Sequence, residues 1–190
     1  LALANVAFAH PTKLGTVGLS LSYFGFELYN ESKIGLNYSR AFGKYFSLGL
    51  QVNYHNYFVS EGSGTPNAVT FEAGVLAKPV KNLNIGFHVF NPSSSLINVE
   101  TEERLPLIAR LGAMYQIGED MCLTAEVKKA EGIAERHAVG LEYRVIEKLI
   151  LRTGVGLQPF TNTFGLGLDL GSFTADISYE YAQVLGSNGN

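Results

Sequence analysis

The sequence predicts an all-β fold, an antiparallel barrel of long up-and-down strands, and three observations predict it. Apolar and polar residues alternate along most of the chain, which is the side-chain period of a β-strand. The chain is 46% hydrophobic and 16% charged, with 21 Gly, but it has no apolar run of the roughly 18 residues that a transmembrane helix needs. The connections between these segments are alternately short and long along the chain.

The alternation defines about twelve strands. In the segment 45–56, for example, Leu48, Leu50 and Val52 lie on one face, and Gly49 and Gln51 lie on the other. We expect strands near residues 2–9, 14–23, 33–41, 45–56, 68–78, 82–90, 106–117, 121–128, 137–145, 148–158, 163–170 and 172–184. The length of 190 residues suggests a single domain, 1–190.

The two faces of these strands differ in a way that favours a membrane barrel. In the strands with the most regular alternation, the apolar face carries no charge, whereas the polar face is rich in Gly and Ser and collects nearly every strand charge. Side chains that face water have no reason to be small, whereas side chains in a crowded barrel interior do. We therefore expect the apolar face in lipid and the polar face in the lumen. The alternative is a soluble β-barrel that binds an apolar ligand in its interior.

The connection lengths favour the same arrangement. Outer-membrane barrels have short periplasmic turns and longer extracellular loops. Short connections are expected at 10–13, 42–44, 79–81, 118–120, 146–147 and 171, long ones at 24–32, 57–67, 91–105 and 129–136, and an intermediate one at 159–162. Aromatic residues near the strand ends suit interfacial belts, namely Tyr23, Tyr38, Tyr45, Tyr54, Tyr57, Phe58, Tyr115 and Tyr143.

The strand count does not close a barrel. The segment 2–9 would run inward and the segment 172–184 outward, and unpaired backbone groups are costly in lipid. One further strand is therefore needed at each end. We expect the chain to be an incomplete barrel, of which the complete form has about fourteen strands.

A set of charged residues on the polar face is the candidate functional site. Glu142 and Arg144, Arg152, Asp169, then Asp176 and Glu180 fall on four consecutive strands, so they can face one another across the ladder. The predicted lumen charge network comprises Arg110, Glu126, Glu142, Arg144, Arg152, Asp169, Asp176 and Glu180. It would either brace the lumen or line a polar path for a ligand.

One part of this set suggests a ligand. Arg110 shares a strand with Ile108 and Met114, and together they would form an amphipathic pocket for an acyl carboxylate. This hypothesis rests on strand parity alone.

Motifs for catalysis, cofactors or metals do not occur. The sequence has no GxSxG, HExxH, CxxC or phosphate loop. Cys122 lies on the lumen face without a matching His, and His55 and His88 fall on strands that are not adjacent. The net charge of −3 argues against a nucleic-acid partner. We therefore expect a protein that is not an enzyme and holds neither metal nor cofactor. A lipid A deacylase would need Ser and His on one rim, and no such arrangement can be assembled.

Several segments resemble a known group of proteins. Residues 14–40, 86–92, 104–112, 140–145, 151–155 and 184–187 resemble Bacteroidetes outer-membrane proteins near the PorV/PorQ group, which belongs with the FadL-like long-chain fatty-acid transporters. The resemblance implies a barrel in the bacterial outer membrane, without an N-terminal plug or the last strand in this sequence. It implies attachment or shuttling in type IX secretion, or uptake of hydrophobic compounds. The implied partners are outer-membrane lipid, secretion-system proteins or a hydrophobic small molecule, and no functional residue is carried over.

Overall fold

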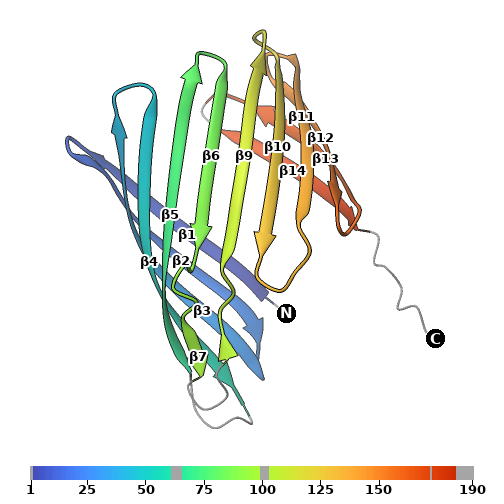
Figure 1. Cartoon of the computed structure of the whole chain (residues 1–190). Coiled ribbons are helices and arrows are strands. Elements are labelled where there is room, and N and C mark those ends of the chain that lie inside the picture. The colour runs from blue at the N-terminus through green and yellow to red at the C-terminus, as the bar shows by residue number, and fades with distance from the viewer. Residues whose placement is uncertain (1, 61–65, 99–102, 172, 183–190) are drawn as a thin grey trace. The chain divides into compact units, whose positions relative to one another are not determined.

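The computed structural model describes residues 2–60, 66–98, 103–171 and 173–182. The regular structure of these residues is entirely β (Figure 1). Across this part of the chain, no helix is long and apolar enough to cross a membrane. The chain divides into two compact units, residues 1–77 with 87–109 and residues 78–86 with 110–190, and we describe each on its own.

The sheet contains 12 strands in the order of the chain. The strands are β1 (Ala2–Thr12), β2 (Gly15–Phe26), β3 (Tyr29–Phe42), β4 (Phe46–Val59), β5 (Asn67–Val80), β6 (Leu83–Phe90), β9 (Ile108–Ile117), β10 (Met121–Ala130), β11 (Arg136–Ile146), β12 (Leu149–Leu157), β13 (Thr161–Asp169) and β14 (Thr174–Ala182). The prediction of about twelve antiparallel up-and-down strands is confirmed.

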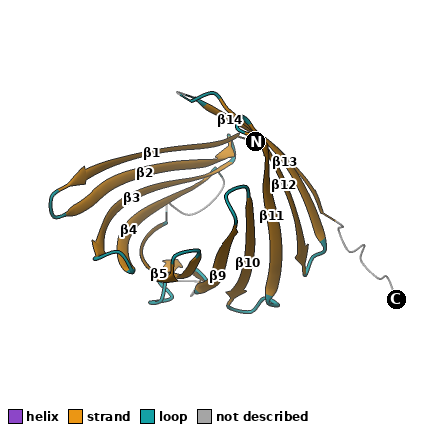
Figure 2. Ribbon diagram, turned by 90° about the horizontal axis from the view of Figure 1, so that it is seen from above, coloured by secondary structure: helices purple, strands orange, loops and turns teal. Residues whose placement is uncertain are grey.

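In the first unit, the register of the strands separates an apolar face from a polar one. Leu19 on β2 lies opposite Leu36 on β3, and Ser20 next to it lies opposite Gly35. The β1–β4 strands run side by side (Figure 2). The apolar face is left uncovered, and the side chain of Leu36 is 65% exposed. We call this the outward face and the opposite one the inward face.

The second unit has the same two faces. Leu151 on β12 lies opposite Leu166 on β13, and the pair beside it is Arg152 with Gly165. On the outward side of β14, Ile177 is 75% exposed. A water-facing protein of this size would bury such residues, so the pattern is the inverted one of a membrane barrel.

The buried residues also follow this inverted pattern. The side chains that are buried most completely among the described residues are polar ones, Asn53, Asn91 and Thr70. The corresponding apolar set is small and consists of Tyr57, Ala68, Cys122, Ala130 and Ile150.

Two connections differ from the sequence prediction. The expected long connection at 24–32 is wrong, because β2 continues to Phe26 and β3 begins at Tyr29. The ladder extends through the pairs Phe24 with Glu31 and Phe26 with Tyr29, so the polar residues Asn30 and Glu31, which suggested a loop, belong to β3. The expected connection at 159–162 is shorter too, because β13 begins at Thr161.

A small hairpin in the connection after β6 was not expected. It consists of β7 (Leu96–Asn98) and β8 (Glu103–Arg104). Both strands are too short to show an alternating pattern in the sequence. Parts of the predicted connections 57–67 and 91–105, and the segment 184–187, lie outside the described residues.

Candidate functional site

The inward face of the first unit carries a connected group of polar side chains. It extends across β3, β4, β5 and β6, and Asn53 and Thr70 within it have no exposed surface. We call this group the Glu72 network; its members are Glu31, Lys33, Gln51, Asn53, His55, Thr70, Glu72 and His88.

Glu72 is the common acceptor of this network. Its carboxylate accepts a hydrogen bond from Asn53 Nδ2 at 2.7 Å, and His88 Nε2 lies 2.9 Å from its other oxygen. Gln51 Nε2 lies at 3.4 Å and the Lys33 ammonium at 3.8 Å. Four side chains from three other strands therefore converge on one carboxylate, which links β3, β4 and β6 to β5.

His55 is also buried in the network. Its side chain lies between Thr70 Oγ1, at 3.0 Å from Nε2, and Glu31 Oε1, at 3.4 Å from Nδ1. The ring stacks on Tyr57 with centroids 6.1 Å apart, and Phe90 meets it edge-on at 6.2 Å. Tyr57 is thus a buried inward residue, and its predicted place in an interfacial belt is wrong because its strand parity turns it into the lumen.

A glycine gives the network its room. A Cβ at Gly35 would lie 2.5 Å from Ser20 Oγ and 2.6 Å from both Asn53 Oδ1 and Gln51 Nε2. The amides of β4 therefore fold over the backbone of β3 only because position 35 has no side chain. This close approach explains one of the inward glycines that the sequence showed.

The connection after β6 is anchored beside this network. Asn91 follows Phe90, is fully buried, and has a φ of 50°, which Asn tolerates better than most residues. Its Nδ2 donates to the Leu105 carbonyl at 2.7 Å, and its Oδ1 accepts from the Ser95 amide at 3.1 Å. Its backbone N–H donates to the Phe71 carbonyl at 2.8 Å, which ties the connection to β5.

In the second unit, the structure brings three of the predicted lumen charges together. The Arg152 guanidinium donates to Glu142 on β11 at 2.6 Å and also to Asp176 on β14. The strand between β12 and β14 is β13, and it has Gly167 where the Arg152 side chain crosses it. A Cβ at Gly167 would lie 2.8 Å from Asp176 Oδ1 and 3.0 Å from the guanidinium.

The other predicted charges do not join this cluster. Asp169 accepts from the Gly171 amide at 2.9 Å and so stabilises the turn before β14. No ion pair within the described part of the chain involves the remaining members, Arg110, Glu126, Arg144 and Glu180.

The cysteine and histidines do not form a metal site. Cys122 is buried on the inward face, where strand parity places it, and it lies opposite Glu142 on β11. His55 and His88 contact different residues of β5, the strand between them. No group of three or more His, Cys, Asp or Glu side chains in the described ranges could hold a metal ion.

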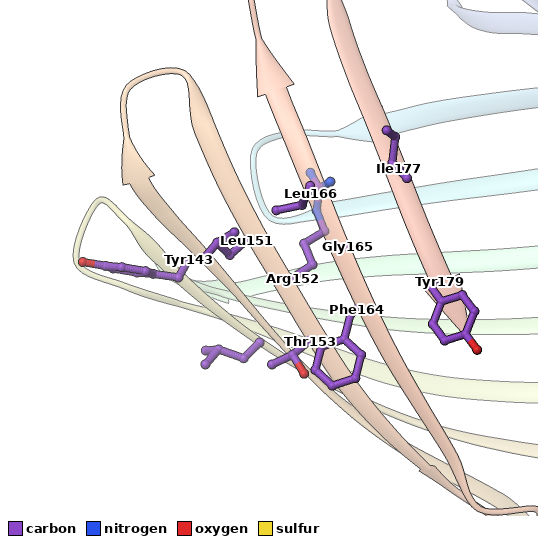
Figure 3. A pocket seen from close by; sticks show the side chains of 10 residues that line it. Tyr143, Leu151, Arg152, Thr153, Phe164, Gly165, Leu166, Ile177 and Tyr179 are labelled. Carbon is purple, nitrogen blue, oxygen red and sulfur yellow. The ribbon is translucent and has the colours of Figure 1, made fainter. Parts of the chain in front are cut away.

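The outward face of the second unit has an open apolar groove of about 510 Å³ (Figure 3). It extends over β11–β14, and its lining residues belong to the outward face except Arg152 and Gly165, which belong to the inward face. The lining residues are Leu141, Tyr143, Leu151, Arg152, Thr153, Phe164, Gly165, Leu166, Ile177 and Tyr179.

Comparison with solved structures decides the fold class. A FadL homologue from Pseudomonas aeruginosa superposes with a TM-score of 0.63 at 16% identity, covering 94% of this chain and 70% of that one. The toluene transporter TodX from Pseudomonas putida superposes with a TM-score of 0.65 at 11% identity, covering 93% and 76%. This chain has the FadL-type transmembrane β-barrel fold.

The FadL-like part of the sequence resemblance is thereby confirmed at the level of fold. No protein-family model matches the chain, and no curated protein matches it. The narrower resemblance to the PorV/PorQ group and to Bacteroidetes proteins has no support among these similar structures.

The sequence predicts one of the two polar clusters. The charges around Arg152 are recognisable because they follow one another on consecutive strands. The Glu72 network is not recognisable in this way, because five of its members are uncharged or histidine and their contacts depend on the register between strands. The usable signal was the parity that places Gln51, Asn53 and His55 on one face of one strand.

Proposed function

We propose that this protein is an outer-membrane β-barrel that takes up hydrophobic compounds and is not an enzyme. The observation that carries the proposal is the fold likeness to a toluene transporter and a FadL homologue over more than nine-tenths of the chain. The strands of the 12-stranded sheet have 8–14 residues. A tilted strand needs about 9–11 residues to cross a bilayer, so these strands are of suitable length.

The two faces support this placement. The outward face presents rows of exposed Leu, Val, Ile, Phe and Tyr. Contact of these side chains with lipid is favourable, whereas their contact with water is not. The inward face has its polar side chains paired with one another, as in the Glu72 network. A soluble barrel that holds an apolar ligand inside would need the opposite assignment of faces.

Within the lumen, two of the three arginines in the predicted charge network have different proposed roles. Arg152 braces the wall, because its charge is already shared by Glu142 and Asp176. Arg110 is exposed and has no ion pair among the described residues, so its charge is available for the carboxylate of an acyl compound. Ile108 and Met114 share its face of β9 and would contact the apolar part of that compound.

A binding measurement separates these roles. Titration of a fluorescent fatty acid into the detergent-folded protein should give a weaker affinity for Arg110→Ala. The variant Arg152→Ala should retain its affinity if it remains folded, which its gel migration checks. Unchanged fatty-acid affinity in both variants would exclude the carboxylate role of Arg110.

Uptake by cells tests the proposed function itself. The protein is produced in the outer membrane of a bacterial strain that lacks its own fatty-acid uptake barrel, and entry of radiolabelled oleate and of toluene is measured. We expect faster entry of at least one compound than in cells with an unrelated barrel at the same abundance. Equal entry at equal abundance of folded protein would contradict the proposal.

The type IX secretion role implied by the PorV/PorQ resemblance has no observation of its own in the fold. Co-purification of secretion components from the native membrane, together with no uptake of either compound, would favour that role instead.

A further inference from the structure

One end of the β1–β4 wall carries cations without any carboxylate. Residues 1–26 and 32–60 contain no Asp or Glu, and the acidic residues between them, Glu27 and Glu31, lie near the opposite end of these strands. Lys13 in the β1–β2 turn and Arg40 and Lys44 beside the β3–β4 turn are all exposed. We call Lys13, Arg40 and Lys44 the basic rim.

The register places these two turns next to each other. Tyr38 Oη on β3 donates to the Leu14 carbonyl at 2.7 Å, which holds the β1–β2 turn against β3. Thr12 Oγ1 donates to the Gly15 carbonyl at 2.6 Å and closes that turn. Lys13 is therefore held beside the part of β3 that leads to Arg40, two residues beyond Tyr38.

Aromatic rings accompany the cations of the rim. The Arg40 guanidinium lies 5.6 Å from the centre of the Phe42 ring, and the Lys44 ammonium lies 5.1 Å from that of Tyr45. Phe42 in turn contacts Phe46, with ring centroids 6.1 Å apart. All three rings are exposed, as rings at the interface between lipid and water are.

The rim continues directly from the apolar outward face. Arg40 lies opposite Leu48, and the preceding outward pairs are Tyr38 with Leu50 and Leu36 with Val52. A molecule that lies along these apolar residues would therefore end at the cations. Its chemistry has to combine long apolar chains with an anionic end.

We infer that the basic rim binds the phosphate of anionic phospholipids, with the acyl chains lying along the outward face of β2–β4. The inference rests on the proposed function, because it requires the barrel to be in a membrane with its short turns at one surface. The arginine supplies a planar fork of donors for phosphate oxygens and the lysines supply point charges. The uncompensated charge gives the preference for an anionic over a zwitterionic headgroup.

The sequence has no Trp, so a single reporter can be placed at the rim. In the variant Tyr45→Trp the reporter is at the rim, and in the control Phe58→Trp it is on the outward side of the other end of β4. Each protein is inserted into phosphatidylcholine vesicles that contain brominated phosphatidylglycerol or brominated phosphatidylcholine. We expect brominated phosphatidylglycerol to quench Tyr45→Trp at several-fold lower mole fraction, and no such preference at Phe58→Trp.

Removing the charges tests which residues carry the preference. In the Tyr45→Trp background, each of Lys13→Gln, Arg40→Gln and Lys44→Gln should lower the relative affinity for phosphatidylglycerol by about fivefold. The matched control Lys129→Gln removes an exposed lysine that pairs with Glu135 at 4.0 Å, and it should leave the preference unchanged.

Three results would overturn the inference. They are equal quenching by the two lipids in Tyr45→Trp, an equal preference at Phe58→Trp, and a preference that inorganic phosphate abolishes but sodium chloride of equal ionic strength does not. The last result would indicate a free-phosphate site. Flotation with pure phosphatidylcholine vesicles tests insertion alone and so separates the basic rim from the proposed function. A protein that inserts into these vesicles but shows no lipid preference in the quenching experiment contradicts the basic rim alone. A protein that does not insert contradicts both.

Discussion

Asn53 and Thr70 are fully buried although they are polar, and each is hydrogen-bonded, to Glu72 and to His55 respectively. A buried polar group costs little when it is paired and about 1–3 kcal/mol when its partner is removed. The packing of the inward face of β3–β6 therefore depends on complete pairing rather than on apolar contact.

Replacing the central acceptor tests this dependence. In Glu72→Gln, an NH₂ group replaces one of the oxygens that receive Asn53, Gln51 and His88, so two donors meet. We expect the free energy of unfolding of the refolded protein to fall by about 1–3 kcal/mol. Glu119→Gln, in the exposed β9–β10 turn, is the control. An equal effect of both changes in a urea titration would contradict the network.

The glycine beneath the network gives a second residue-level prediction. A side chain at position 35 would collide with Asn53 and Gln51, so Gly35→Ala should destabilise the protein by about 1–3 kcal/mol. Gly49→Ala is the matched control on the neighbouring strand, since its Cβ would meet Ser39 Cβ at 3.6 Å, an ordinary contact. A Gly49→Ala variant less stable than Gly35→Ala would show that the amides do not fold over β3.

At the scale of the strands, the alternation of residues predicted the elements well. Each of the expected segments corresponds to one strand, because the two-residue period is a property of the strand itself. The ends were predicted less well. Asn30 and Glu31 suggested a loop, although the pairing of β2 with β3 continues past them.

The β13 strand allows a direct test of the face assignment. Leu166 points outward at mid-strand, so Leu166→Arg should cost about 2–4 kcal/mol when the protein is refolded into vesicles. Ser178→Arg, on the inward side of β14, should cost much less because Glu180, two residues along the same face, has no ion pair among the described residues and can offset the added charge. Similar losses of stability in the two variants would contradict the assignment of the faces.

At the scale of the whole molecule, the sequence predicted the fold class but only part of the candidate site. The fold class follows from the alternation of apolar and polar residues together with the small residues of the polar face, both of which recur from strand to strand in the sequence. The joining of Arg152 to Glu142 and Asp176 also required glycines at 165 and 167, over which its side chain reaches β14. The Glu72 network required the register of β3 with β4 and of β4 with β5, which residue periodicity does not determine.

The central claim is that the exposed apolar face lies in lipid and the polar face does not. The most direct test uses single tryptophans, because the chain has none of its own. Phe164→Trp places the reporter on the outward face of β13, and Phe90→Trp places it inward beside His55. In vesicles with brominated acyl chains, we predict strong quenching of Phe164→Trp and weak quenching of Phe90→Trp. Strong quenching of Phe90→Trp with none of Phe164→Trp would show that the faces are reversed.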